Sequence, residues 1–137
     1  MKENLFAFRI SLVIASAFVL GACFEALAAG DAALAIRIGD IPSAHGPTML
    51  MDESLSALLL LLVAIWLFFL SGEIKKGVFR ARLQGLLIGI SIMLFGAGFW
   101  YKFPEMMAPA VFWGLGFILT LSMLVPAKTK GSSPIKP

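Results

Sequence analysis

The sequence predicts an all-α integral membrane protein with four transmembrane helices and both termini in the cytoplasm. Of its 137 residues, 60% are hydrophobic and 14% are charged, a composition outside the range of soluble globular domains. The charged residues gather between four long apolar windows, and Lys and Arg gather on alternate connections. The windows lie at about residues 10–29, 54–71, 83–100 and 106–125. Together with their connections they use almost the whole chain, so we expect residues 1–137 to form a single membrane domain.

The second window carries the strongest signal for a membrane-spanning helix. From Leu55 to Leu70 it is rich in leucine and holds no charged residue. A helix of this length, with its flanking serines, can cross a hydrocarbon core of about 30 Å. Its large apolar residues contribute roughly −4 to −7 kcal/mol to insertion. We therefore expect this window to lie in lipid.

The first window shares features with a signal peptide. The basic residue Lys2 precedes the apolar stretch, and Ala26-Leu27-Ala28 fits the small-x-small pattern that signal peptidase recognises. However, the apolar stretch of about twenty residues is longer than the roughly 7–15 residues of a signal-peptide core. We therefore expect a retained helix.

The connections between the windows differ in length. The longest covers residues 30–53 and is interrupted by glycines and prolines. Within it, residues 32–38 could form a short helix lying in the membrane surface. The link between the third and fourth windows is short, which predicts that these two helices lie side by side and antiparallel. Pro126 ends the fourth window, and residues 127–137 are typical of a disordered basic tail.

The basic residues predict the orientation of the spans. Of the 11 Lys and Arg residues, Arg37 and Lys102 fall on the two outer loops, which leaves nine on the amino end, the 72–82 link and the tail. By the positive-inside rule these nine lie in the cytoplasm and residues 30–53 lie outside. We expect a multi-pass protein of the cell membrane, specifically a bacterial inner membrane. Because the basic residues flank the spans, the net charge of +3 does not indicate nucleic-acid binding.

Glu25 is the ionisable residue placed well inside a window. One interpretation is a proton- or cation-coupled site, because a carboxyl group at membrane depth is costly and is commonly functional. The other is a carboxyl that reaches the outer surface or pairs with Arg37. Ala17 and Gly21 share the face of Glu25 at i+4 spacing, so a partner helix could approach this acid closely.

A lone glutamate in the first of four short helices resembles the small multidrug-resistance transporters. The resemblance covers chain size and helix number. In that family the glutamate lies near the middle of the membrane, whereas Glu25 is displaced toward the outer surface and its neighbours differ. We therefore transfer no function from this resemblance.

Small residues predict helix packing in the last two windows. Gly85 and Gly89 form one small-xxx-small pair, and Ala110 and Gly114 form a second. Such pairs let two helix backbones approach within van der Waals range. They could pack the last two helices against each other or against a partner protein. The windows hold more small residues than one interface requires, so we expect a second interface.

Groups able to carry catalysis or bind a metal are scarce. The chain has one cysteine and one histidine. With Cys23 as its single cysteine, the chain can form neither an internal disulfide nor a cysteine-cluster metal site. His45 lies in a loop rich in proline and glycine, and the spacing of the residues around it matches no metal site. The serines have no nearby base. We predict no catalytic residue, no metal, no cofactor and no enzymatic activity.

These observations favour a non-catalytic role. We expect a small accessory, assembly or regulatory subunit of a larger membrane complex, whose partners are the lipid bilayer and other membrane-protein subunits or further copies of itself. The alternative is a small oligomeric transporter or channel for protons, cations or a small solute that uses Glu25.

Overall fold

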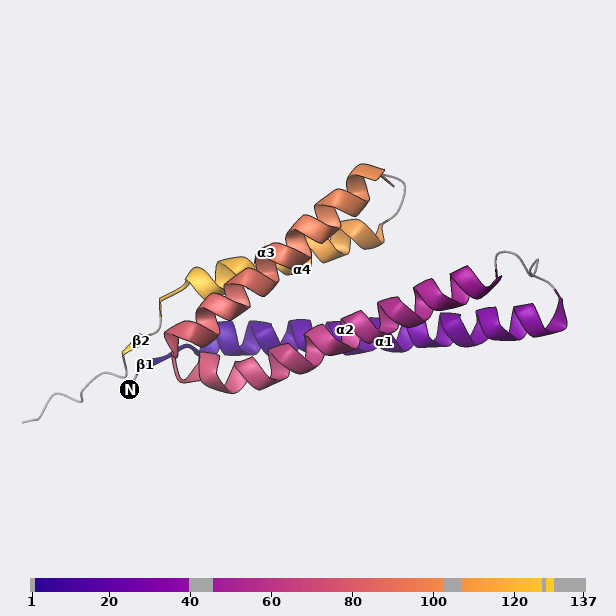
Figure 1. Cartoon of the computed structure of the whole chain (residues 1–137). Helices are drawn as coiled ribbons and strands as arrows, with labels where there is room; N and C mark the ends of the chain where they lie inside the picture. The colour runs from indigo at the N-terminus through magenta and orange to yellow at the C-terminus, as the bar shows by residue number, and fades with distance from the viewer. Residues whose placement is uncertain (1, 40–45, 103–106, 127, 130–137) are drawn as a thin grey trace, which may run out of the picture. The chain divides into compact units, whose positions relative to one another are not determined.

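The computed structural model contains four helices and a short strand pair in its described part (Figure 1). The helices are α1 (Leu5–Ile38), α2 (Gly46–Lys75), α3 (Phe79–Lys102) and α4 (Ala108–Leu124). The strands β1 (Lys2–Glu3) and β2 (Lys128–Thr129) pair antiparallel. The described residues are 2–39, 46–102, 107–126 and 128–129. Over these residues the structure confirms the expected all-α class.

Three helices are long and apolar enough to cross a membrane. They contain 34, 30 and 24 residues in α1, α2 and α3. At 1.5 Å per residue, each exceeds the hydrocarbon thickness of about 30 Å. Helix α4 has 17 residues and spans about 25 Å, which is shorter than that thickness. Three helices of this kind indicate a membrane protein.

Helix α1 extends well beyond the expected first window. The short surface helix expected over residues 32–38 is instead the end of α1. The physical reason is the alanine-rich sequence around Gly30, since alanine has the highest helix propensity and one glycine costs only about 1 kcal/mol. The helix ends at Gly39, which has a φ of 83° and donates its N–H to the Ile36 carbonyl over 3.2 Å. A left-handed glycine is a common helix terminator.

Helix α2 begins at Gly46, so the connection expected over residues 30–53 is much shorter. Pro47 lies in the first turn of α2, where its missing N–H costs little. Residues 40–45, which include His45, lie outside the described residues. Of the tail expected over residues 127–137, the structure describes β2, which pairs with β1, and the remainder lies outside the described residues.

The connection between α2 and α3 is a tight turn. Gly77 has a φ of 72° and donates its N–H to the Ile74 carbonyl, while the Val78 N–H donates to the Glu73 carbonyl. These two bonds form a Schellman motif that satisfies carbonyls at the end of α2. The helices therefore continue into the charged residues on both sides of the turn.

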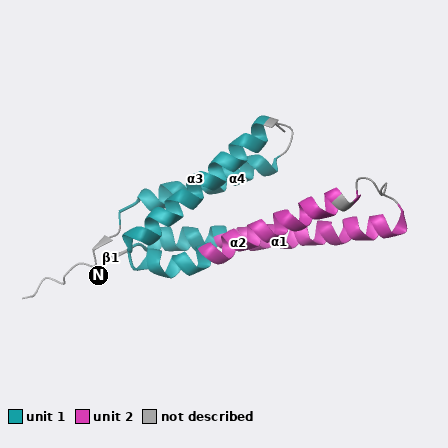
Figure 2. Ribbon diagram, viewed as in Figure 1, with its two compact units in different colours: residues 1–14, 67–137 teal, residues 15–66 magenta. Residues whose placement is uncertain are grey.

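The chain divides into two compact units (Figure 2). Unit 1 contains residues 1–14 and 67–137, and unit 2 contains residues 15–66. Unit 1 thus combines the start of α1, the end of α2 and all of α3 and α4. Unit 2 contains the rest of α1 and α2 as an antiparallel helical hairpin.

Each unit buries a narrow seam and exposes large apolar side chains outside it. In unit 1, Leu67, Ile74 and Leu119 are completely buried. In unit 2, the buried residues are mainly alanines, together with Phe18. Phe69 is 80% exposed, and many leucines of α2 are also exposed. In water such a surface would be an association or aggregation hazard, whereas in lipid it is in its preferred environment.

Candidate functional site

Glycines bring the backbones of α3 and α4 into direct contact in unit 1. A Cβ atom at Gly116 would lie 2.5 Å from the Met93 nitrogen and 2.6 Å from the Gly89 carbonyl oxygen. A Cβ atom at Gly89 would lie 2.6 Å from Thr120 Oγ1 and 2.9 Å from the Thr120 nitrogen. Real Cβ atoms do not approach backbone atoms this closely, so both positions require glycine in this arrangement.

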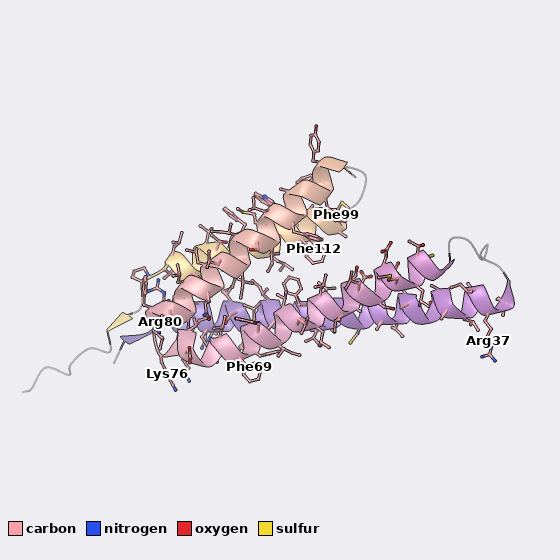
Figure 3. The ribbon with its side chains drawn as sticks, viewed as in Figure 1. Arg37, Phe69, Lys76, Arg80, Phe99 and Phe112 are labelled. Atoms are coloured by element: carbon pink, nitrogen blue, oxygen red, sulfur yellow. The ribbon has the colours of Figure 1, made fainter. Side chains whose placement is uncertain are left out.

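The contact continues along both helices. A Cβ atom at Gly96 would lie 2.5 Å from the Trp113 nitrogen and 2.7 Å from the Pro109 carbonyl oxygen. Beyond the glycines, the rings of Phe95 and Phe112 meet edge to face with their centroids 6.2 Å apart, and Figure 3 shows Phe112 on α4. Edge-to-face packing is a favoured aromatic geometry. The α3–α4 pair is therefore fixed in register over most of the length of α4.

The predicted small-residue pairs take different positions in this contact. Gly85 and Gly89 both face α4, and Gly85 meets the flexible side chain of Met123. Gly114, in contrast, has no atom within 4 Å of the place where a Cβ would lie, and Ala110 is half-buried. On α4, Gly116 makes the close contact instead. Gly114 therefore takes no part in the α3–α4 contact, and packing against a partner protein stays a prediction for this position.

Hydrogen bonds from Asn4 tie together three helix ends in unit 1. The Asn4 Oδ1 accepts the Ala7 N–H over 3.0 Å, which caps the start of α1. The Asn4 backbone N–H donates to the Lys75 carbonyl at the end of α2 over 3.1 Å. Its Nδ2 donates to the Val125 carbonyl after α4 over 3.0 Å. Asn4 is 3% exposed, so these bonds lie in a water-poor environment.

Arg82 also donates to carbonyls at the end of α4, including the Val125 carbonyl that Asn4 binds. Its Nε donates to the Met123 carbonyl over 3.2 Å, and its Nη2 donates to the Val125 carbonyl over 2.9 Å. A second bond joins Nη2 and the Met123 carbonyl. The last carbonyls of a helix have no partner within the helix, and an unpaired polar group in lipid costs several kcal/mol. Arg82 and Asn4 supply the missing donors.

Neither Asn4 nor Arg82 is among the residues for which the sequence predicts a role in helix packing. Asn4 directly precedes the first helical residue, and an asparagine at that position is a recognised N-cap signal. It could therefore have been found. Arg82 gave no comparable signal, because its bonds to α4 depend on how α3 and α4 are aligned. From the sequence, Arg82 is one of the nine basic residues that predict the orientation of the spans.

In unit 2, Glu25 of α1 lies beside Glu53 of α2. Both side chains are half-buried, and their carboxyl groups are within hydrogen-bonding reach of each other. Gly21 faces α2 one turn away, since a Cβ there would lie 3.4 Å from Leu60 Cδ1, and Ala17 is half-buried. The pairing of Glu25 with Arg37 is excluded within this helix, because the two are about 18 Å apart along its axis.

Glu53 was also missed, because residues 30–53 were expected to form a loop. Helix α1 ends at Ile38 and α2 begins at Gly46, so Glu25 lies farther from the connection between them than Glu53 does. Their proximity depends on how α1 and α2 align, which spacing in the sequence does not give.

Other chemistry is sparse in the described part of the chain. Cys23 is exposed on α1 and unpaired. The described residues contain no group of three or more His, Cys, Asp or Glu side chains that could hold a metal ion. An open hollow of about 420 Å³ lies on the α3–α4 pair and is lined by Ala97, Trp100, Tyr101 and Trp113. Trp and Tyr are typical of membrane–water interfaces.

Comparisons with protein-family models, curated proteins and solved structures give no match to this chain.

The glycine contact predicts a difference between two neighbouring positions of α4. Gly116→Ala should lower the free energy of unfolding by about 1–3 kcal/mol, because the added methyl forces α3 and α4 apart. Gly114→Ala is the matched control, since its methyl enters open space and alanine favours helix. Unfolding in detergent micelles, followed by circular dichroism, measures both. Equal stability of the two variants would contradict the close contact.

The capping interaction predicts a difference between two arginines of α3. Arg82→Met should destabilise the protein by about 1.5–3 kcal/mol, because charged donors to the α4 carbonyls are lost. Arg80→Met is the control, since Arg80 is exposed and remains outside this network. Thermal unfolding of both variants in the same detergent tests this. If Arg80→Met lowered the melting temperature as much as Arg82→Met does, the capping bonds would make no specific contribution to stability.

Proposed function

We propose that this chain is a non-catalytic accessory, assembly or regulatory subunit of a larger membrane complex. The observation that carries the proposal is the division of the glycines on α3 and α4. Gly85, Gly89, Gly96 and Gly116 are occupied by the contact within the chain, whereas Gly98 and Gly114 have open space around them. Open glycines among exposed apolar side chains allow the backbone of a second helix to approach closely in lipid.

The proposed topology has four spans with both termini in the cytoplasm of a bacterial cell. Helix α4, at about 25 Å, is close to the lower limit for a span. Its contact with α3 supports a full crossing, because α3 is long enough to span and α4 follows it in the opposite direction. The distribution of the basic residues supports the orientation.

The accessory-subunit proposal predicts that the protein migrates in a large complex. After mild solubilisation, blue-native electrophoresis of the tagged chain should show a band far above its 14.7 kDa. Gly114→Leu should shift much of the protein to lower mass by filling the open face of α4. Gly30→Leu is the control, because it adds the same side chain at an open position of α1. A monomer in mild detergent would contradict the proposal.

A second candidate function rests on the apposed carboxyl groups of Glu25 and Glu53. Two carboxyl groups within hydrogen-bonding reach can hold a proton or a cation between them, and intramembrane acids commonly mark ion pathways. This supports a small oligomeric transporter or channel. It requires further copies of the chain, because one helical hairpin does not enclose a pathway.

The transporter candidate predicts that Glu25→Gln and Glu53→Gln each abolish proton or cation flux in proteoliposomes. Removing either charge breaks the shared site while keeping the shape of the side chain. Glu73→Gln is the control, since Glu73 is exposed near the other end of α2. Flux with a fluorescent pH or cation indicator is the measurement. Unchanged flux in both Glu25→Gln and Glu53→Gln would eliminate this candidate.

A further inference from the structure

Four basic residues gather where α1 begins and α2 passes into α3. Arg9, Lys75, Lys76 and Arg80 all belong to unit 1, and all four are exposed. The bond from the Asn4 N–H to the Lys75 carbonyl holds the start of α1 beside the end of α2. We call these four residues the basic cluster. Figure 3 shows Lys76 and Arg80 on the two sides of the α2–α3 turn.

The charges of the basic cluster are largely uncompensated by the protein. In the described part of the chain, the side chains of Lys76 and Arg80 have no hydrogen-bond or ion-pair partner, and the Lys75 ammonium lies 5.4 Å from the centre of the Phe8 ring. Glu73 is the exposed acid at this turn. Arg82 is nearby in sequence but is excluded from the cluster, because it binds the α4 carbonyls.

Apolar side chains fix the depth of the basic cluster in a membrane. Phe79 lies between Lys76 and Arg80 in the sequence and is 75% exposed, and Phe6 is also exposed. Exposed Phe rings at a helix end at the membrane surface insert at the boundary between the headgroups and the acyl chains. The long Lys and Arg side chains then extend along this surface to the phosphates.

From this juxtaposition we infer that the basic cluster binds the phosphate headgroups of anionic phospholipids. The ligand carries a phosphodiester and a net negative charge, which the four cations match, while the exposed aromatic rings contact the upper part of its acyl chains. A zwitterionic headgroup has a compensating ammonium, so the cluster attracts it less. This inference does not depend on the proposed accessory role, since a monomer could also bind lipid in this way.

The test is native mass spectrometry of the full chain in uncharged detergent micelles with equal amounts of phosphatidylglycerol and phosphatidylcholine. The wild-type protein should retain phosphatidylglycerol preferentially. Each basic residue near an anionic surface contributes about fivefold to binding, so K76Q/R80Q should lower the preference by up to about twenty-five-fold. The control R37Q removes an exposed cation from unit 2 and should leave the preference unchanged.

Two further arms separate charge from folding and lipid from free phosphate. K76R/R80K keeps both charges and should keep the preference, while circular dichroism verifies the helicity of every variant. Inorganic phosphate at millimolar concentration should leave the bound lipid in place. The inference is overturned by equal retention of both lipids in the wild type, by an undiminished preference in helical K76Q/R80Q, or by displacement with inorganic phosphate.

Discussion

The close approach of α3 and α4 at their glycines is the interaction on which unit 1 depends. Apolar side chains are as stable in contact with lipid as in contact with another helix. Two helices in a membrane therefore associate through tight packing and polar contacts. Gly89, Gly96 and Gly116 supply the tight packing, because each lies where a Cβ would collide with backbone atoms. The same alignment brings Arg82 to the end of α4, where it donates to the Met123 and Val125 carbonyls. A shift of α4 by one turn would break the packing and the capping together.

This coupling also explains how a short fourth helix can belong to a membrane protein. With 17 residues, α4 is shorter than the hydrocarbon thickness of about 30 Å. Its terminal carbonyls therefore need donors from the protein, and Asn4 and Arg82 provide them. Asn4 extends the arrangement to α1 and α2 through its bonds to the Ala7 N–H and the Lys75 carbonyl. One buried asparagine thus connects the ends of three helices, α1, α2 and α4, within unit 1.

The sequence predicts the helices more reliably than their contacts. Long apolar windows predict α1, α2 and α3, because length and apolar composition are enough to identify a helix that can cross a membrane. The face that packs on a neighbour depends on rotation about the helix axis, which i+4 spacing does not fix. Both the Ala110–Gly114 pair and Gly116 give α4 a small-residue face, and the structure places Gly116 against α3 while Gly114 faces open space. Gly85 and Gly89 were identified because they share one face of α3. Glu53 and Arg82 were missed because their partners are set by how helices align.

In the proposed topology, α4 packs against α3, crosses the membrane and returns the chain to the cytoplasm. Single cysteines at Tyr101 and Thr129, introduced with Cys23→Ala, place a reactive thiol near each end of the α3–α4 pair. Intact cells are treated with a membrane-impermeant maleimide. The account predicts that Tyr101→Cys is labelled and that Thr129→Cys is labelled only after the cells are permeabilised. Labelling of Thr129→Cys in intact cells to the same extent as Tyr101→Cys would contradict it.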